Sequence, residues 1–229
     1  MFRGKKYQNS SKGLDREKLY TLEEAMDMLL AHSATKFDSS CEIHLNTSTD
    51  PKYADQVIRS TCALPHGTGK KIKIVAFTKD AAQAKAALAA GALKAGGEEL
   101  IEEVVKGFTA FDIAVATPEM MKDMGKVAKT LGPKGLMPNP KSGTVTDQVE
   151  KVVAELAAGK IEFKNDKFGI VHSVFGKISF GKEKLSANLN ALLKSINQAK
   201  PTGVKGVYLK GITICSTMSP GIKIDLKSI

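Results

Sequence analysis

The chain has 229 residues, of which 42% are hydrophobic, so it can bury one or two sizeable cores and is not a disordered polymer. Its formal net charge of +10 favours a polyanionic partner, either nucleic acid or an anionic membrane surface. No run of about 18 apolar residues is present, and the basic start leads into polar residues rather than an apolar signal segment, so we expect a cytoplasmic protein with no membrane partner.

The sequence of the first 46 residues predicts an arm, a helix and a strand. Residues 1–13 are basic and polar, which indicates a flexible arm. Thr21 and Glu24 have the spacing of a capping box, and apolar residues follow at helical spacing to about His32. Apolar and polar residues then alternate from Cys41 to Asn46, which predicts a half-buried strand. Its polar face consists of Glu42, His44 and Asn46.

The middle of the chain alternates between strand-like and helix-like segments. Residues 64–70 contain a Pro and two Gly and interrupt regular structure. The expected elements that follow are strands over 71–77 and 111–117 and helices over 80–90, 98–105 and 148–158. This order is typical of βαβ units around a parallel sheet.

Strand-like segments return after Gly159. We expect strands over 161–163, 169–175, 207–215 and 222–226, and a helix with a clean apolar stripe over 182–199. Neither end of the chain has enough elements to bury a core by itself. The sequence therefore predicts one discontinuous α+β domain, residues 1–69 with 158–229, and an inserted α/β domain, residues 70–157.

The two predicted domains differ in charge. Residues 70–157 carry 13 Lys, no Arg and 11 acidic residues, whereas the rest of the chain carries 21 basic and 13 acidic residues. Such a surplus attracts backbone phosphates without regard to sequence, although lysines that merely solubilise a surface are the alternative. The scarcity of aromatic residues, with four Tyr, nine Phe and no Trp, favours folded RNA over single strands that stack on exposed rings.

Residues 67–70 read Gly-Thr-Gly-Lys and resemble part of a phosphate-binding loop. Such a loop follows a strand, opens a helix and has Ser or Thr after its Lys. Here Lys71 follows, and a strand comes next. A hinge is the better interpretation, because glycines absorb large changes in backbone dihedral angles.

Two further segments leave alternatives open. In residues 131–141, Leu136 and Met137 either fold back onto their own domain or form a protruding contact surface. Residues 216–221 form either a plain β-turn or a turn that presses its backbone against a ribose, with Met218 as an apolar cover.

The polar residues give no sign of catalysis or metal binding. The three cysteines, Cys41, Cys62 and Cys215, are far apart and odd in number, which indicates buried, reduced thiols. The four histidines lack metal-ligand spacing, and no Ser/His/Asp or paired-carboxylate arrangement can be placed. We therefore expect no metal, no cofactor and no enzymatic activity.

Six stretches are distinctive in combination. They are Lys36-Phe37, Asp50-Pro51, residues 64–70, residues 131–145, residues 165–169 and Ser216-Thr217-Met218. Over essentially the whole chain, these stretches resemble the L1 family of ribosomal proteins, which form the mobile stalk of the large subunit beside the tRNA exit site.

The resemblance implies an α/β protein with a split β-α-β domain built from both chain ends and a Rossmann-like insert. It implies a monomer within the ribosome whose first domain binds a folded junction of large-subunit ribosomal RNA. It also implies that the stalk assists release of deacylated tRNA from the exit site. In bacterial members it implies repression of the protein's own messenger, whose leader mimics the ribosomal site.

Carried over position by position, the resemblance gives an RNA-contact surface, and the glycines at the two junctions between the predicted domains are expected to act as hinges. The contact residues are Lys36, Phe37, Ser40, Glu42, Asp166, Lys167, Gly169, Ser216, Thr217, Met218 and Ser219. The hinge residues are Gly67, Gly69 and Gly159. Two positions depart from the family: Ser219 stands where a Gly is usual, and Gly211 where some relatives carry a hydroxyl residue.

The expected mechanism divides these residues by chemistry. Lys36 and Lys167 neutralise phosphates, and the Thr217 and Ser40 hydroxyls donate to ribose or phosphate oxygens. Phe37 and Met218 exclude water, which makes each hydrogen bond more discriminating. Two rival interpretations remain: an enzyme acting on RNA or a nucleotide, and a free regulatory RNA-binding repressor that differs only in its partner.

Overall fold

The computed structural model describes residues 4–33, 35–204 and 206–228. The chain divides into two compact units: unit 1 comprises Met1–Gly69 and Glu162–Ile229, and unit 2 comprises Lys70–Ile161. The second boundary falls later than the one expected after residue 157, because helix α7 (Val149–Ala158) runs directly into strand β6 (Lys160–Lys164). Within the described ranges, no helix combines the length and apolar character needed to cross a bilayer.

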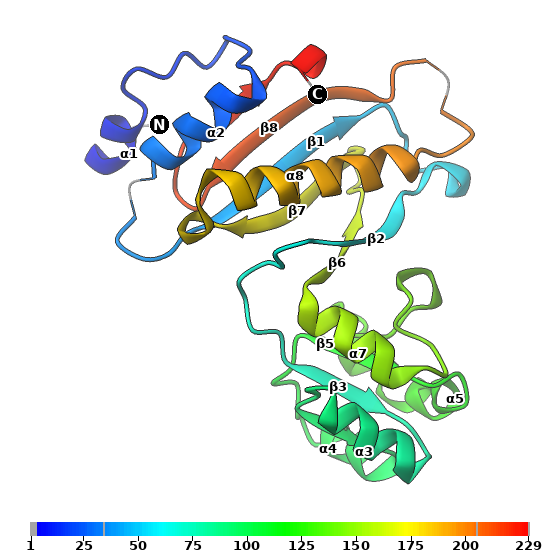
Figure 1. The fold of residues 1–229 in the computed structure, drawn as a ribbon. Coiled ribbons are helices and arrows are strands. Elements are labelled where there is room, and N and C mark those ends of the chain that lie inside the picture. The colour runs from blue at the N-terminus through cyan, green and yellow to red at the C-terminus, as the bar shows by residue number, and fades with distance from the viewer. Residues whose placement is uncertain (1–3, 34, 205, 229) are drawn as a thin grey trace. The chain divides into compact units, whose positions relative to one another are not determined.

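The main sheet of unit 1 joins the two ends of the sequence. Its strand order is β7 (Ile170–Lys177), β1 (Ser40–Thr47), β8 (Leu209–Ser216) and β9 (Ile222–Ile224). β7 and β8 both pair antiparallel with β1, so they run parallel to each other, and helix α8 (Gly181–Gln198) connects them. β1 thus splits a β-α-β unit (Figure 1), and the predicted α/β fold class is confirmed.

Two helices cover one face of this sheet. α2 (Leu22–Ala31) begins at the predicted capping box, in which Thr21 accepts from the Glu24 amide and the Glu24 carboxylate accepts from the Thr21 amide. The apolar stripe of α8 is buried against the sheet through Leu185, Leu189, Leu192, Leu193 and Ile196. Figure 1 shows both helices on the same side of the strands. Neither helix covers the opposite face of the sheet, where the polar side chains of the alternating strands lie.

A bulge in the main sheet is stabilised from α8. The pairing of β1 with β7 skips Phe175, because Cys41 pairs with Gly176 and Glu42 with Val174. The fully buried Asn188 amide donates to the Phe175 carbonyl (2.8 Å), which satisfies a group at the irregularity. The same side chain accepts from the His66 amide (3.0 Å) and donates to the Gly67 carbonyl (2.9 Å), so it also anchors the turn that ends the first segment of unit 1.

The remaining elements of unit 1 are short. A two-stranded sheet pairs β2 (Arg59–Ala63) with β6. Residues 5–10 form helix α1 (Lys5–Ser10), so the expectation of a flexible arm is wrong there, and residues 1–3 lie outside the described part of the chain. Short 3-10 turns occupy Ala54–Gln56, Ile178–Phe180 and Leu226–Ser228.

Unit 2 is a parallel α/β unit. Its sheet has the order β4 (Lys94–Gly96), β3 (Ile74–Phe77) and β5 (Ile113–Ala116), with both pairings parallel. The helices are α3 (Ala81–Ala89), α4 (Glu98–Val105), α5 (Met120–Met124), α6 (Ala128–Leu131) and α7, with 3-10 turns at Gly125–Val127 and Pro140–Ser142. The predicted βαβ alternation is thereby confirmed.

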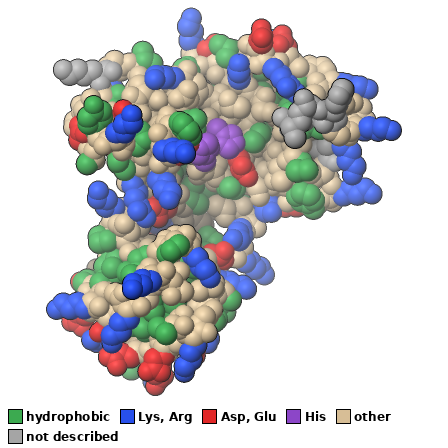
Figure 2. All heavy atoms as spheres, turned by 180° about the vertical axis from the view of Figure 1, so that it is seen from behind, with side chains coloured by type: hydrophobic (Ala, Val, Ile, Leu, Met, Phe, Trp, Pro, Cys, Tyr) green, Lys and Arg blue, Asp and Glu red, His purple; other side chains and the backbone are tan. Residues whose placement is uncertain are grey.

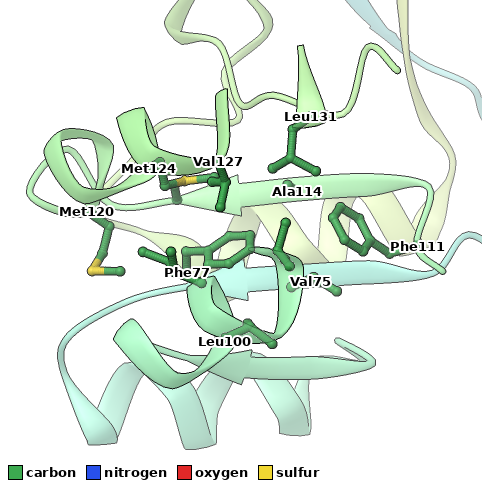
Figure 3. Packing of buried hydrophobic residues seen from close by; sticks show 12 residues of the cluster. Val75, Phe77, Leu100, Phe111, Ala114, Met120, Met124, Val127 and Leu131 are labelled. Carbon is green, nitrogen blue, oxygen red and sulfur yellow. The ribbon is translucent and has the colours of Figure 1, made fainter. Parts of the chain in front are cut away.

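The core of unit 2 decides between the two interpretations of the 131–141 segment. Leu131 is fully buried in a cluster with residues of β3, β5 and α4, and Figure 3 shows it beside Ala114 and Phe111. Leu136 and Met137 are partly buried against this same cluster. The apolar pair therefore folds back onto its own unit, and burial of its apolar surface is a sufficient reason for its presence.

Candidate nucleic-acid interface

The face of the main sheet that α2 and α8 leave uncovered carries a line of polar side chains. Alternation along β1 places Glu42, His44 and Asn46 on this face, while Cys41, Ile43 and Leu45 are fully buried on the other. His172 on β7 lies directly opposite His44. Figure 2 shows histidine side chains exposed in the middle of this face, with acidic and basic side chains beside them.

One end of this face is formed by the turn that follows β8. The Ser219 amide donates to the Ser216 carbonyl (2.9 Å), which closes a four-residue turn. Met218 occupies the third position with a φ of 68°, and its side chain is 75% exposed. A left-handed φ is costly for a residue with a side chain, so the fold holds an apolar group in water on a strained backbone.

Ser219 locks this turn in place. Its hydroxyl accepts from the Ser216 amide (2.8 Å) and donates to the Ser216 carbonyl (3.0 Å). A glycine at position 219 could not make these bonds, so Ser219 gives the turn a local hydrogen-bonded lock. Ser216 itself is buried, and its amide and carbonyl are both bonded within the turn, so its place in the turn is structural.

The Thr217 hydroxyl is bonded to the first residue of β1. It accepts from the Ser40 amide (3.1 Å) and donates to the Ser40 carbonyl (3.3 Å), and the Thr217 amide donates to the same carbonyl (3.0 Å). The single hydroxyl proton of Thr217 is therefore used inside the protein. These bonds hold the backbone next to Met218 against the start of β1, and the predicted contact of Thr217 with RNA stays a prediction.

A pocket of about 570 Å³ adjoins this turn. Four of the predicted contact residues and the adjacent Thr35 line it, together with three residues of the N-terminal segment. The lining residues are Gly4, Lys6, Tyr7, Thr35, Lys36, Phe37, Met218 and Ser219. Lys36 is exposed, and Phe37 is 60% exposed, so this end of the face combines positive charge with two apolar side chains open to solvent.

The other end of the face is the turn between β6 and β7. The Asp166 carboxylate accepts from the amides of Phe168 (2.9 Å) and Ile170 (2.8 Å). Burial opposes ionisation of Asp166, but these two amide hydrogen bonds and the nearby His172 outweigh it, so its pKa is lowered. Lys167 is exposed and lies over the Phe168 ring at 5.2 Å from its centroid.

The backbone at position 169 requires a glycine. Its φ is +77°, and a Cβ there would collide with the Thr49 carbonyl. The Gly169 carbonyl accepts from the Thr47 hydroxyl (2.6 Å) and amide (3.1 Å), which ties the turn to the end of β1. Gly169 is buried, so its contribution is to hold the neighbouring Lys167 and Asp166 in position.

The turns at the two ends of the sheet face do not form one compact cluster, but polar side chains on the face lie between them. Ser40 and Asn46 are separated by six residues of extended strand, or about 20 Å. Asp166 contacts His172 (3.3 Å), and His172 contacts His44 (2.8 Å), so a hydrogen-bonded row runs from the far turn to the middle of the face. Burial first, and then the electrostatic effect of neighbouring His172, lowers the pKa of His44.

The three expected hinge glycines all adopt left-handed conformations, with φ of 64° at Gly67, 73° at Gly69 and 111° at Gly159. Gly159 ends α7, where its amide donates to the Leu156 carbonyl (3.1 Å). The Gly67 carbonyl is held by Asn188. Each glycine thus has a structural reason for being present, and the hinge role stays a prediction.

Several residues of the exposed face were not identified from the sequence. Lys6 and Tyr7 line the pocket because residues 5–10 form a helix, and a polar hexapeptide carries only a weak helix signal. The alternation along β1 predicted that His44 lies on the polar face of the strand. The contacts of His44 with His172 and Cys215 depend on strand register between distant segments, which the sequence pattern does not give. Exposure of Phe168, at 70%, also becomes visible only in the folded turn.

The chain is a two-unit α/β protein. The exposed polar face of its main sheet has lysines and exposed apolar side chains at both ends, which is typical of a binding protein. The chain belongs to the ribosomal protein L1p/L10e family, whose model matches residues 29–220. This membership confirms the prediction of a structural, non-enzymatic protein.

Similar proteins come from several bacteria. Proteins called "Large ribosomal subunit protein uL1" share 51% identity with the chain in Desulfotalea psychrophila and 48% in Protochlamydia amoebophila, each over 97% of this chain and 94% of the relative. A protein of the same name in Clavibacter michiganensis subsp. michiganensis is 47% identical over the full length of both chains.

Proposed function

We propose that the chain is a structural protein of the large ribosomal subunit in the cytoplasm, and that it binds folded ribosomal RNA through the uncovered sheet face of unit 1. The observation that carries this proposal is the exposure of Phe37 and Met218, at 60% and 75%, beside exposed Lys36. Grouped exposed apolar side chains rimmed by polar and charged residues are typical of interaction sites.

The charge distribution supports unit 1 as the binding unit. It carries 20 basic and 13 acidic residues, against 14 basic and 11 acidic residues in unit 2. Lys36 precedes the start of β1, Lys167 lies in the turn tied to the end of β1, and six residues of strand span about 20 Å. This spacing suits two phosphate groups of a folded RNA rather than two adjacent phosphates of one strand.

In the proposed mechanism, the two lysines neutralise phosphates while Phe37 and Met218 cover the contact and exclude water. Thr217 and Ser219 hold Met218 in place through their bonds to Ser40 and Ser216. Recognition then depends on the shape of the RNA, because the rigid turn accepts only a backbone path that fits between the two ends.

The test compares affinities in a filter-binding titration with a large-subunit ribosomal RNA fragment that contains the stalk junction. Lys36→Ala combined with Met218→Ala should raise Kd by roughly 10- to 100-fold, equivalent to about 1–3 kcal/mol. A duplex RNA of equal length should bind the native chain much more weakly than the junction does.

Matched control substitutions lie in unit 2. Lys85 on α3 is exposed, and Val105 on α4 is 61% exposed, so Lys85→Ala combined with Val105→Ala removes the same kinds of groups from another surface. The control pair should leave Kd within about twofold. Equal losses from both pairs would show that binding follows total charge rather than this face, and the proposal would be wrong.

We further propose, from the family resemblance, that the chain assists release of deacylated tRNA from the exit site and represses translation of its own messenger. The second proposal rests on the same face, because a messenger leader that mimics the ribosomal junction would occupy it. Competition between the junction fragment and the chain's own leader RNA for the native protein tests the second proposal. Simultaneous binding of both RNAs would contradict it.

A further inference from the structure

Three side chains with metal-binding atoms meet on the uncovered face of unit 1. Glu42 and His44 are on β1, and Cys215 lies opposite Glu42 on β8. One ligand atom from each lies within 4.8 Å of the other two. His44 Nε2 is 3.4 Å from Cys215 Sγ and 4.0 Å from Glu42 Oε2.

A row of hydrogen bonds prepares His44 as a ligand. The ionised Asp166 carboxylate can only accept, so His172 Nε2 carries a proton toward it (3.3 Å). His172 Nδ1 is then the acceptor in its 2.8 Å contact with His44 Nδ1, and His44 Nδ1 carries the proton. The lone pair of His44 is thereby left on Nε2, the atom that faces Cys215 and Glu42.

We propose that Glu42, His44 and Cys215 form a binding site for a divalent metal ion of the zinc class. Thiolate, imidazole and carboxylate are the ligand types that Zn²⁺ takes in proteins, and sites with three protein ligands are usual where a fourth position stays open. The row through His172 to Asp166 is the kind of outer-shell support that metal-bound histidines have. This proposal replaces the expectation, based on sequence spacing, that the chain has no metal site.

The observed spacing is close to what a tetrahedral ion requires. With metal–ligand distances of about 2.0–2.3 Å, pairs of ligand atoms around a tetrahedral ion are separated by about 3.3–3.8 Å. The His44–Cys215 separation of 3.4 Å already fits. Glu42 must move closer, and its side chain, 41% exposed, has the freedom to rotate.

The charges also favour a cation at this position. A thiolate at Cys215 and the Glu42 carboxylate are two negative groups on neighbouring strands, and a divalent cation between them balances both. On binding, the S–H bond of Cys215 breaks, its proton goes to solvent, and the sulfur electron pair forms the bond to the metal. No electron is transferred, so no oxidant or reductant is needed. The site requires no RNA, and the proposal stands or falls independently of the proposed function.

Cobalt is the probe of choice, because its thiolate complexes absorb in the near ultraviolet and its tetrahedral complexes absorb in the visible. The full chain, freed of metal by a chelator and kept reduced with a phosphine, is titrated with Co²⁺. We expect a thiolate-to-cobalt charge-transfer band that saturates at one equivalent and disappears when Zn²⁺ is added. A chain that gives no such band at one equivalent would overturn the proposal.

Substitutions identify the ligands. Cys215→Ser should abolish the charge-transfer band, and His44→Gln should weaken binding at least tenfold. Glu42→Gln should keep the band with lower affinity, so at least one variant reports on the site even if another fails to fold by circular dichroism. His172→Gln should weaken binding about 10-fold or more, through the loss of support for His44.

Control substitutions use the same residue types elsewhere in unit 1. Cys62→Ser and His66→Gln should leave the band and the affinity unchanged, because Cys62 is buried in β2 and His66 is exposed in the turn held by Asn188. A band that persists in Cys215→Ser but disappears in Cys62→Ser would place the metal on the wrong cysteine and refute the assignment.

Discussion

At Met218, two unfavourable features coincide: a left-handed backbone with a φ of 68° and an apolar side chain that is 75% exposed. Neither feature contributes to the stability of the isolated protein. Backbone strain of this kind persists where the surroundings enforce it, and it is common at binding sites. Here the enforcing contacts are those of Thr217 with Ser40 and of Ser219 with Ser216.

This strain gives a prediction in which stability and binding change in opposite directions. Met218→Gly removes the cost of the left-handed φ, so the free energy of unfolding should stay constant or rise by up to about 1 kcal/mol. Met218→Ala keeps the strained φ and should leave stability within about 0.5 kcal/mol. Urea unfolding measures both variants, and both should bind the junction RNA more weakly. A loss of more than about 1 kcal/mol in Met218→Gly would show that the side chain stabilises the fold.

Thr217 allows the positioning role of a hydroxyl to be separated from a direct role in binding. Thr217→Val preserves the shape but leaves the Ser40 amide without its side-chain acceptor, so unfolding should become easier by about 1–2 kcal/mol. Thr217→Ser keeps the hydroxyl and should behave like the native chain in the same urea titration. If Val weakened RNA binding with no change in stability, the hydroxyl would contact the RNA directly.

At the level of elements, Asn188 shows how one polar side chain on α8 connects three segments. It accepts from the His66 amide and donates to the carbonyls of Gly67 and Phe175, and it is fully buried. Buried polar groups that lose their partners pay the full cost of desolvation. The bulge in β7 and the turn at residues 64–67 therefore depend on the same residue.

Asn188→Leu should consequently lower the free energy of unfolding by roughly 2–3 kcal/mol, although it adds apolar surface to a buried helix face. Asn190→Leu is the matched control, because Asn190 is exposed on the same helix and its substitution should change stability by less than about 0.5 kcal/mol. Thermal or urea unfolding of the two variants provides the comparison. Equal effects would mean that the three hydrogen bonds of Asn188 contribute little.

Elements with a strong local pattern could be predicted from the sequence. The capping box at Thr21, the alternation of β1 and the leucine stripe of α8 each determine structure within a few residues. β2 was missed, because its five residues lack clean alternation and its partner β6 lies about 100 residues away in the chain. The strand expected over 71–77 is shorter: Ile74–Phe77 pairs with β5, and within it residues 75–77 also pair with β4.

The candidate site was less predictable from the sequence, because it too depends on contacts between segments that are far apart in the chain. Lys36, Phe37 and Met218 could be proposed from the sequence and its resemblance to a family, and all three line one pocket. The inward role of Thr217 could not, because its partner Ser40 is 177 residues away. The meeting of His44 with Cys215 likewise depends on the register of β1 with β8, which no local pattern specifies.

At the scale of the whole molecule, the chain separates its charge between two units. Unit 1 has an excess of seven basic residues and unit 2 an excess of three. Each unit has its own sheet and its own buried core. If the proposed interface is correct, the phosphate contacts that dominate affinity belong to unit 1, and the insert contributes little to the salt dependence of binding.

Replacing residues 70–161 with a flexible Gly-Ser linker tests this division. Binding of the junction RNA should stay within about tenfold of the native value, and the slope of log K against log salt should change by less than one unit, because the phosphate contacts remain. Lys36→Ala in the full chain should reduce that slope by about one, the amount expected for one lost phosphate contact. Circular dichroism and a cooperative melt establish first that the shortened chain is folded. A folded, shortened chain with a much smaller salt slope would locate the phosphate contacts in unit 2 and refute the assignment of the interface to unit 1.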